Sequence, residues 1–244
     1  MIVVDRVTKA FKAPVLRDVS LRVPAGQIVA LVGPGASGKS VLFKVVTGLI
    51  RPDGGKVTID GEEVTAMGEL ELGRVRKRIG MLFQNNALFD HMSVADNIAF
   101  PLRRLFSPPE DEVRSRVAER LERVALPGFE ARMPAGLSGG QRKRVGIARA
   151  TITRAPIVLY DEPTAGLDPV TSQKIYNLIR DEQCADGSTV MVISSDVQGV
   201  LTIADRVAML HRGNLVFEGP VNEARASSQP ALRQFLNGLE EGPL

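Results

Sequence analysis

The chain has 244 residues, of which 44% are hydrophobic, and a formal net charge of +3, so it can bury a large core as one domain with subdomains. Its basic residues are scattered through charged segments, which argues against nucleic-acid binding, and its single cysteine, Cys184, excludes an internal disulfide and fits a reducing compartment. No apolar run reaches the roughly 18 residues of a membrane-spanning helix, and the N-terminus lacks the pattern of a signal peptide.

The first segments predict a small antiparallel sheet. Residues 2–7 and 15–23 alternate apolar and polar side chains, as strands with one buried face do. Phe11 lies between these two strands. Such an aromatic side chain can stack on a nucleotide base or fill the core of the sheet, and periodicity alone favours the core.

A phosphate-binding loop follows. The apolar run 27–32 predicts a buried strand, and residues 41–49 repeat apolar side chains at helical spacing. Between them, residues 33–40 match G-x-x-x-x-G-K-[ST] in full. This placement aims the loop amides and the positive end of the helix dipole at phosphates. Lys39 adds a charge for the β- and γ-phosphates and Ser40 a hydroxyl for Mg²⁺. A chance glycine-rich turn is disfavoured, because strand, loop and helix are all present.

A second polar residue is predicted at the end of a strand. Residues 56–61 predict a strand that runs into a turn, and residues 69–78 predict a short helix. The strand predicted over residues 79–83 ends at Gln84. Beside a phosphate loop, this glutamine is a candidate ligand for Mg²⁺ or for the attacking water, because such sites lie at the carboxyl ends of strands.

Residues 85–155 are predicted to be mainly helical. Residues 93–96 resemble a capping box, and residues 113–124 carry an apolar stripe whose opposite, charged face we interpret as solvated. The segment Leu137–Gln141 precedes a further helix and offers another anion site at a helix N-terminus. By itself this second site is a weak signal.

Two carboxylates end the next buried strand, over residues 157–162. Beside a bound Mg²⁺–nucleotide, Asp161 would hold the metal shell and Glu162 would polarise the attacking water. A tight connection over residues 165–169 then leads into a helix.

The last elements are a strand, a hairpin and a closing helix. Residues 189–193 predict a buried strand, and residues 207–217 predict a hairpin around Gly213 and Asn214. Residues 228–239 predict a helix that packs on the body of the protein. Its apolar face comprises Leu232, Phe235, Leu236 and Leu239.

Together these motifs resemble the ATP-binding subunits of ABC transporters over essentially the whole chain. Residues 33–40 resemble the Walker A loop, Gln84 the Q-loop, residues 137–141 the signature motif, residues 157–162 Walker B, and residues 165–168 the D-loop. Phe11 falls where the family has the aromatic residue that stacks on the base. The resemblance therefore implies nucleotide contacts from Phe11, Gly33, Gly35, Ala36, Ser37, Gly38, Lys39, Ser40, Val41, Ser138, Gly139, Gly140, Gln141 and Asp168.

The family fold implied is α/β, of the P-loop NTPase type, with a RecA-like core, a small antiparallel β subdomain and an inserted helical subdomain. The core and β subdomain would comprise residues 1–84 and 156–227, the helical subdomain residues 85–155, and a C-terminal helix and tail residues 228–244. Two copies would form a head-to-tail dimer that encloses two ATP molecules with Mg²⁺. Such a two-fold arrangement makes the interface isologous.

A narrower resemblance is to the ATPases of Mla/Mce-type lipid-transport systems. It rests on residues 81–89, 96–103, 196–206 and 233–239. That family implies a membrane permease, a periplasmic lipid-binding protein and, in some systems, a STAS-type regulator. It also implies a peripheral location on the cytoplasmic side of the inner membrane.

Three residues depart from the family pattern. Ala36 replaces a glycine, Val41 replaces a hydroxyl residue, and Ser195 stands where the family has a switch histidine that contacts the γ-phosphate. Alanine costs about 1 kcal/mol if position 36 needs a positive φ, unless Gly35 absorbs the turn. Other functions stay open: transport of another substrate, or a nucleotide-binding regulator that hydrolyses poorly because of Ser195. A soluble ABC protein of ribosomes or DNA is disfavoured, because the chain has neither two fused ATPase units nor a coiled-coil insertion.

Overall fold

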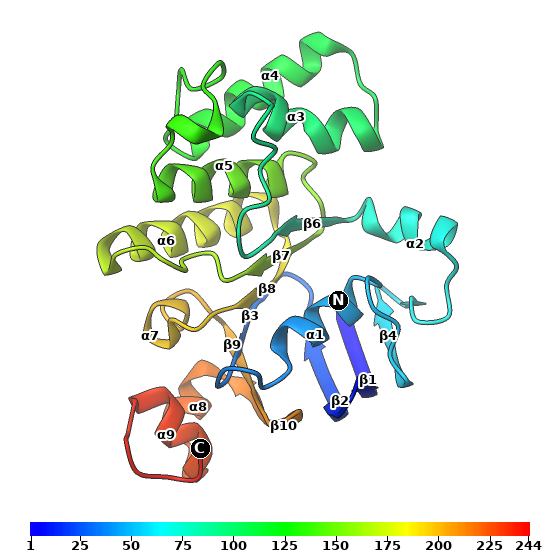
Figure 1. The fold of residues 1–244 in the computed structure, drawn as a ribbon, viewed down its shortest axis with the longest axis vertical. Helices are drawn as coiled ribbons and strands as arrows, with labels where there is room; N and C mark the ends of the chain where they lie inside the picture. Colours follow the sequence, from blue (N-terminus) through cyan, green and yellow to red (C-terminus); the bar gives the residue numbers. More distant parts are fainter. The chain divides into compact units, whose positions relative to one another are not determined.

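The computed structural model in Figure 1 describes residues 1–244. The chain divides into two compact units. The first unit comprises Met1–Arg76 and Thr189–Leu244, and the second comprises Lys77–Ser188. The helical subdomain predicted over residues 85–155 lies within the second unit, and its exact boundaries stay a prediction. No helix of the structure is both long and apolar enough to cross a bilayer.

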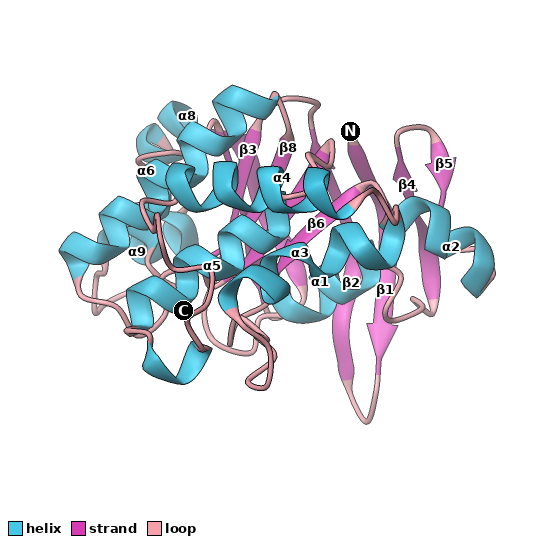
Figure 2. Ribbon diagram, turned by 90° about the horizontal axis from the view of Figure 1, so that it is seen from above, coloured by secondary structure: helices cyan, strands magenta, loops and turns pink.

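The first unit contains an antiparallel sheet in the order β2-β1-β4-β5, whose strands lie side by side in Figure 2. Val4 pairs with Leu21 on one side and with Val57 on the other. Alternate residues of β2 are buried, so the alternation seen in the sequence marks the core face. The strands are β1 (Ile2–Ala10), β2 (Pro14–Val23), β4 (Gly54–Ile59) and β5 (Glu62–Glu63).

Parallel strands form a second layer of the first unit. β3 (Ile28–Val32) lies between β8 (Thr189–Ile193) and β9 (Arg206–His211), and β10 (Asn214–Pro220) runs antiparallel to β9. Every residue of β3 and β8 is buried. Strands covered on both faces have continuous apolar sequences, which explains the runs seen here. Because β3 and β8 are parallel, the loops that follow them start at the same edge.

Five helices complete the first unit. They are α1 (Lys39–Val46), α2 (Glu69–Arg76), α7 (Val197–Val200), α8 (Val221–Ala226) and α9 (Pro230–Asn237). α9 buries Leu232 and Leu236, as predicted. The prediction for Leu239 is wrong: Gly238 adopts a left-handed φ of 62° and ends the helix, so Leu239 leaves the buried face and is 49% exposed.

The second unit packs helices around two parallel strands. The strands are β6 (Ile79–Leu82) and β7 (Ile157–Asp161); the helices are α3 (Val94–Leu105), α4 (Glu110–Arg123), α5 (Gly139–Thr151) and α6 (Pro169–Asp186), with a 3₁₀ turn at Pro134–Gly136. Helices α3, α4 and α5 lie beside one another in Figure 1 and share one apolar core. Gly80 allows α5 to approach β6, since a Cβ there would lie 2.0 Å from the Ala150 carbonyl oxygen.

Polar side chains fix the ends and spacing of these helices. The buried Arg120 of α4 pairs with Glu182 and Asp186 of α6. Ser93 caps α3 by accepting a hydrogen bond from the Asp96 amide, as predicted. The Asp96 carboxylate also accepts a hydrogen bond from the Ser93 hydroxyl, so the two side chains are bonded to each other at the start of α3.

Candidate functional site

The predicted phosphate loop connects β3 to α1 in the first unit and depends on two glycines. Gly33 has a φ of 145°, and a Cβ there would lie 2.1 Å from the Leu210 carbonyl oxygen. Gly38 has a φ of 106°, and its Cβ would lie 2.9 Å from the Val15 carbonyl oxygen. Both positions therefore exclude larger residues, which allows the main chain to form a tight cradle.

Ala36, which stands where the family pattern has glycine, adopts the left-handed backbone conformation. Its φ is 57°, whereas Gly35 has no positive φ. The turn is therefore not absorbed by Gly35, and alanine carries a conformational cost of about 1 kcal/mol at this position.

Lys39 and the start of α1 complete the loop. The Lys39 ammonium donates hydrogen bonds to the carbonyl oxygens of Gly33, at 2.7 Å, and Pro34, at 2.9 Å. Gly38 is the N-cap of α1, and no side chain caps the helix there. The first-turn amides of α1 are thus left for an anion, as in phosphate sites. Ser40 is exposed in this first turn. The first-turn amides, the Lys39 ammonium and the Ser40 hydroxyl are therefore donors that fit a nucleotide phosphate.

Ser195 and Phe11 belong to the same unit. Ser195 is exposed just beyond the carboxyl end of β8, the strand that pairs in parallel with β3. It therefore lies at the strand edge from which the phosphate loop starts. Phe11 lies in the turn between β1 and β2 and is 62% exposed, with the Lys9 ammonium 5.5 Å from its ring centre. The interpretation of Phe11 as a core residue is wrong, because the turn carries its ring out of the sheet.

The second unit brings together the other predicted catalytic residues. Leu82 of β6 pairs with Tyr160 of the parallel strand β7. Gln84 follows β6 and Glu162 follows β7, so both lie at the same strand edge. Glu162 has a φ of 49°, an uncommon conformation for a residue with a side chain. Tyr160, the buried residue before Asp161, has the pKa of its phenol raised by burial.

The main-chain carbonyls of Gln84 and Glu162 share one hydrogen-bond donor that could not be predicted from the sequence. The Lys143 ammonium of α5 donates to the carbonyl oxygens of Gln84, at 2.8 Å, and Glu162, at 2.9 Å. Burial lowers the pKa of Lys143, while the nearby Glu162 and Asp161 carboxylates oppose that shift. Lys143 sits in the basic run 142–144, which predicts a solvated face. The one signal was its spacing of four residues from the buried Ile147.

The predicted signature motif forms the start of α5. Ser138 and Gln141 form a full capping box, in which the Gln141 side chain accepts from the Ser138 amide at 2.9 Å. A Cβ at Gly140 would lie 3.0 Å from the Thr171 methyl carbon, and one at Gly139 would lie 3.4 Å from Leu167. The signature glycines thus lie directly against the predicted D-loop and the start of α6.

Asp168 ends that D-loop as the N-cap of α6. Its carboxylate accepts a hydrogen bond from the Thr171 amide at 2.9 Å. A hydrogen bond from the Thr171 side chain, together with this bond from the Thr171 amide, holds the pKa of Asp168 below its usual value.

The family model described as ABC transporter matches residues 16–165. The chain belongs to the ABC transporter ATP-binding family. As an ABC ATPase domain it binds ATP, and the family supports ATPase activity.

Two curated ABC proteins and one solved ABC cassette illustrate the similarity. The probable ribonucleotide transport ATP-binding protein mkl of Mycobacterium leprae is 41% identical over 99% of this chain and 70% of its own length. The intermembrane phospholipid transport system ATP-binding protein MlaF of Escherichia coli is 41% identical over 93% of this chain and 84% of its own. A dimeric ATP-binding cassette solved with ADP and Pi has a TM-score of 0.84 and 32% identity, covering 91% of this chain and 99% of that one.

The predicted ABC site residues divide between the two units. Phe11, the Walker A residues 33–41 and Ser195 belong to the first unit; Gln84, the signature residues 138–141, Asp161, Glu162 and Asp168 belong to the second. Within each unit these predicted residues lie at strand ends, at helix starts or, for Phe11, in a turn between strands.

Proposed function

We propose that this ABC ATPase is the motor subunit of a transporter that moves phospholipids between the inner and outer membranes, within an Mla/Mce-type complex. The observation that carries the proposal is the 41% identity to MlaF over 93% of this chain. The name of MlaF describes it as the ATP-binding protein of an intermembrane phospholipid transport system.

ATP binding is assigned to the first unit's phosphate loop. The loop amides of residues 33–41 and the Lys39 ammonium bind the phosphates, and Phe11 stacks on the base. Oxygen atoms of Ser40, Gln84 and Asp161 hold Mg²⁺, which when bound neutralises charge that develops on the phosphates. These are hard oxygen donors, and Mg²⁺ in nucleotide sites typically takes only a few protein ligands alongside the phosphates.

Hydrolysis is assigned to Glu162 as the general base that orients water. A second copy of the chain completes each site by contributing Ser138, Gly139, Gly140, Gln141 and Asp168. The capping box of α5 supports this role, because it fixes the helix end that faces the γ-phosphate of the other copy.

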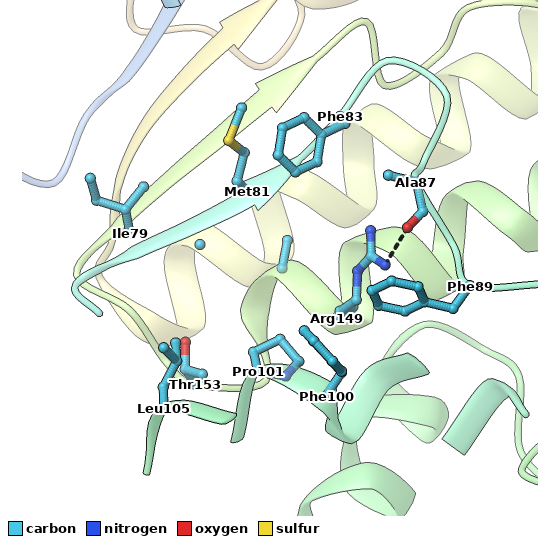
Figure 3. A pocket seen from close by; sticks show the side chains of 12 residues that line it. Ile79, Met81, Phe83, Ala87, Phe89, Phe100, Pro101, Leu105, Arg149 and Thr153 are labelled. Atoms are coloured by element: carbon cyan, nitrogen blue, oxygen red, sulfur yellow. Dashed lines mark hydrogen bonds between the residues drawn. The ribbon is translucent and has the colours of Figure 1, made fainter. Parts of the chain in front are cut away.

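The permease is placed against a groove in the second unit. This groove has a volume of about 330 Å³ and is lined mainly by apolar side chains from β6, α3 and the loop after Gln84 (Figure 3). The rings of Phe89 and Phe100 lie 4.8 Å apart at one wall. An apolar groove next to Gln84 suits a partner that senses the state of the nucleotide.

The remaining partners follow from the Mla/Mce assignment. The chain acts peripherally on the cytoplasmic side of the inner membrane, bound to its permease. A STAS-type regulator and a periplasmic lipid-binding protein belong to the same proposed complex.

Turnover is proposed to be slow. Ser195 is shorter than histidine, so the γ-phosphate loses one donor in the transition state. Binding suffers less, because Lys39 and the loop amides already contact the phosphates in the ground state. The extreme form of this proposal is a nucleotide-binding regulator that hydrolyses very little.

Transport of another substrate is the alternative, favoured by the name of mkl, a ribonucleotide transport protein. Purification of the complex from native membranes, with mass spectrometry of its proteins and lipids, separates the two. We expect an Mce-type protein, a permease and enriched phospholipid. Recovery with a nucleotide-binding or amino-acid-binding partner and no enriched lipid would contradict the lipid assignment.

A further inference from the structure

Lys143 is a buried cation on the signature helix α5. Its residue exposure is 4%, although it stands in a basic run with Arg142 and Arg144. A lysine is rarely buried unless its ammonium is paired. The interior of the second unit therefore must supply acceptors for this side chain.

Those acceptors are main-chain carbonyls of two predicted site residues. The ammonium donates to Gln84 at 2.8 Å and to Glu162 at 2.9 Å. An ammonium has three donors, so one side chain can join both carbonyls at once. Gln84 and Glu162 follow the neighbouring parallel strands β6 and β7. The last paired residues of these strands are Leu82 and Tyr160. Beyond that pair, Lys143 connects the two main chains through its hydrogen bonds.

Arg149, six residues further along α5, holds the same loop at a second place. Its guanidinium donates to the carbonyl oxygen of Asn86. It also donates to that of Ala87, at 2.7 Å, and Figure 3 shows this second bond. Asn86 and Ala87 have φ values of 60° and 48°, so their backbone conformation is costly without such support. Arg149 also lines the apolar groove. Cations of α5 thus fix the loop that starts at Gln84.

We propose that Lys143 is a positioning residue for ATP hydrolysis, because it ties the main chain of Gln84 to that of Glu162. The inference rests on the roles proposed above for these two residues. Without the ammonium, the carbonyl oxygens of Gln84 and Glu162 each lose one hydrogen bond, and the two loops can move independently. A displacement of about 1 Å at a catalytic group can cost roughly 10²-fold in rate.

Two neutral substitutions of equal length separate hydrogen bonding from packing. Methionine and glutamine have side chains of the same length, and only glutamine can donate. We expect Lys143→Met to lower kcat at least tenfold, with the Kd for ATP by calorimetry within threefold of wild type. We expect Lys143→Gln to restore kcat to within threefold of wild type. Lys174→Met, an exposed site on α6, is the control and should leave both quantities unchanged.

Hydrogen exchange gives a readout independent of turnover. In Lys143→Met, amides of residues 83–88 and 162–166 should exchange faster than in wild type, while α3 amides stay unchanged. Equal kcat values for the two Lys143 variants, or acceleration spread equally over α3, would overturn the inference.

Glu162→Gln measured in parallel tests the proposed site itself. If Glu162→Gln abolishes hydrolysis while Lys143→Met is as active as wild type, only the role of Lys143 fails. If Glu162→Gln also hydrolyses normally, the proposed catalytic assignment fails as well.

Discussion

The Lys39 ammonium donates a hydrogen bond to the carbonyl oxygen of Gly33, 2.7 Å away and at the start of the same loop. The loop thus carries its own cation in position before any phosphate binds. The ammonium is attracted more strongly to a phosphate oxygen, which carries a full negative charge, than to a carbonyl oxygen, which carries only a partial one. We therefore expect phosphate to replace the carbonyl contacts of Lys39.

The first prediction is that Lys39→Ala abolishes tight ATP binding. The substitution removes the only fixed charge of the loop and leaves the amides of residues 33–38 in place. Calorimetry with Mg²⁺–ATP measures the effect. Lys44→Ala, at an exposed position on α1, is the matched control and should bind as wild type does. Unchanged affinity in Lys39→Ala would refute the assignment of this loop.

A second prediction concerns the strain at Ala36. Its φ of 57° costs alanine about 1 kcal/mol, and the greater freedom of glycine in the unfolded chain offsets part of that cost. Ala36→Gly should therefore raise the free energy of unfolding by about 0.5 kcal/mol in urea denaturation.

Gly38→Ala should have the opposite effect. Its φ of 106° and its close approach to the Val15 carbonyl should lower stability by at least about 1 kcal/mol. If Ala36→Gly destabilises the protein instead, position 36 does not carry the strain.

The strands and helices with strong periodicity could be predicted from the sequence. The continuous apolar runs at residues 27–32 and 189–193 correspond to β3 and β8, which are buried along their whole length. The stripe over residues 113–124 corresponds to α4. The phosphate-loop motif also predicted its own surroundings, since it binds phosphate with amides at the start of a helix. In the structure the loop lies between the buried strand β3 and the helix α1.

What the sequence could not show depends on residues far apart in the chain. Lys143 is 59 residues from Gln84 and 19 from Glu162, and its local sequence is typical of a solvated helix face. Leu239 continues the helical spacing, but a single left-handed glycine removes it from the helix. Phe11 fits the period of a strand, yet the tight turn exposes it.

A third prediction tests the groove as the permease site. Phe89→Asp places a charge beside Phe100 in the apolar wall, so assembly with the permease should fall at least fivefold in co-purification yield while soluble ATP binding persists. Leu70→Asp, at a 92% exposed residue of the other unit, should assemble normally. Wild-type yield from Phe89→Asp would show that the permease binds elsewhere.

The fourth prediction is that Ser195→His raises kcat at least tenfold, with a smaller change in KM. Loss of one transition-state donor typically costs about 10²–10³ in rate, and the imidazole restores such a donor. Phosphate release, measured with the permease present, gives both constants. Ser195→Ala is the control, and we expect it to match wild type. Equal kcat values for wild type and Ser195→His would mean that serine already performs the role of histidine.

Phosphate release by Glu162→Gln at saturating Mg²⁺–ATP tests the central claim, that this chain is an ATP-hydrolysing motor with its base at the end of β7. Glutamine preserves the size of the side chain and removes the carboxylate that accepts a proton from water. We predict measurable turnover by wild type and at least a hundredfold less by Glu162→Gln, with ATP still bound. Turnover by Glu162→Gln equal to that of wild type would contradict the account.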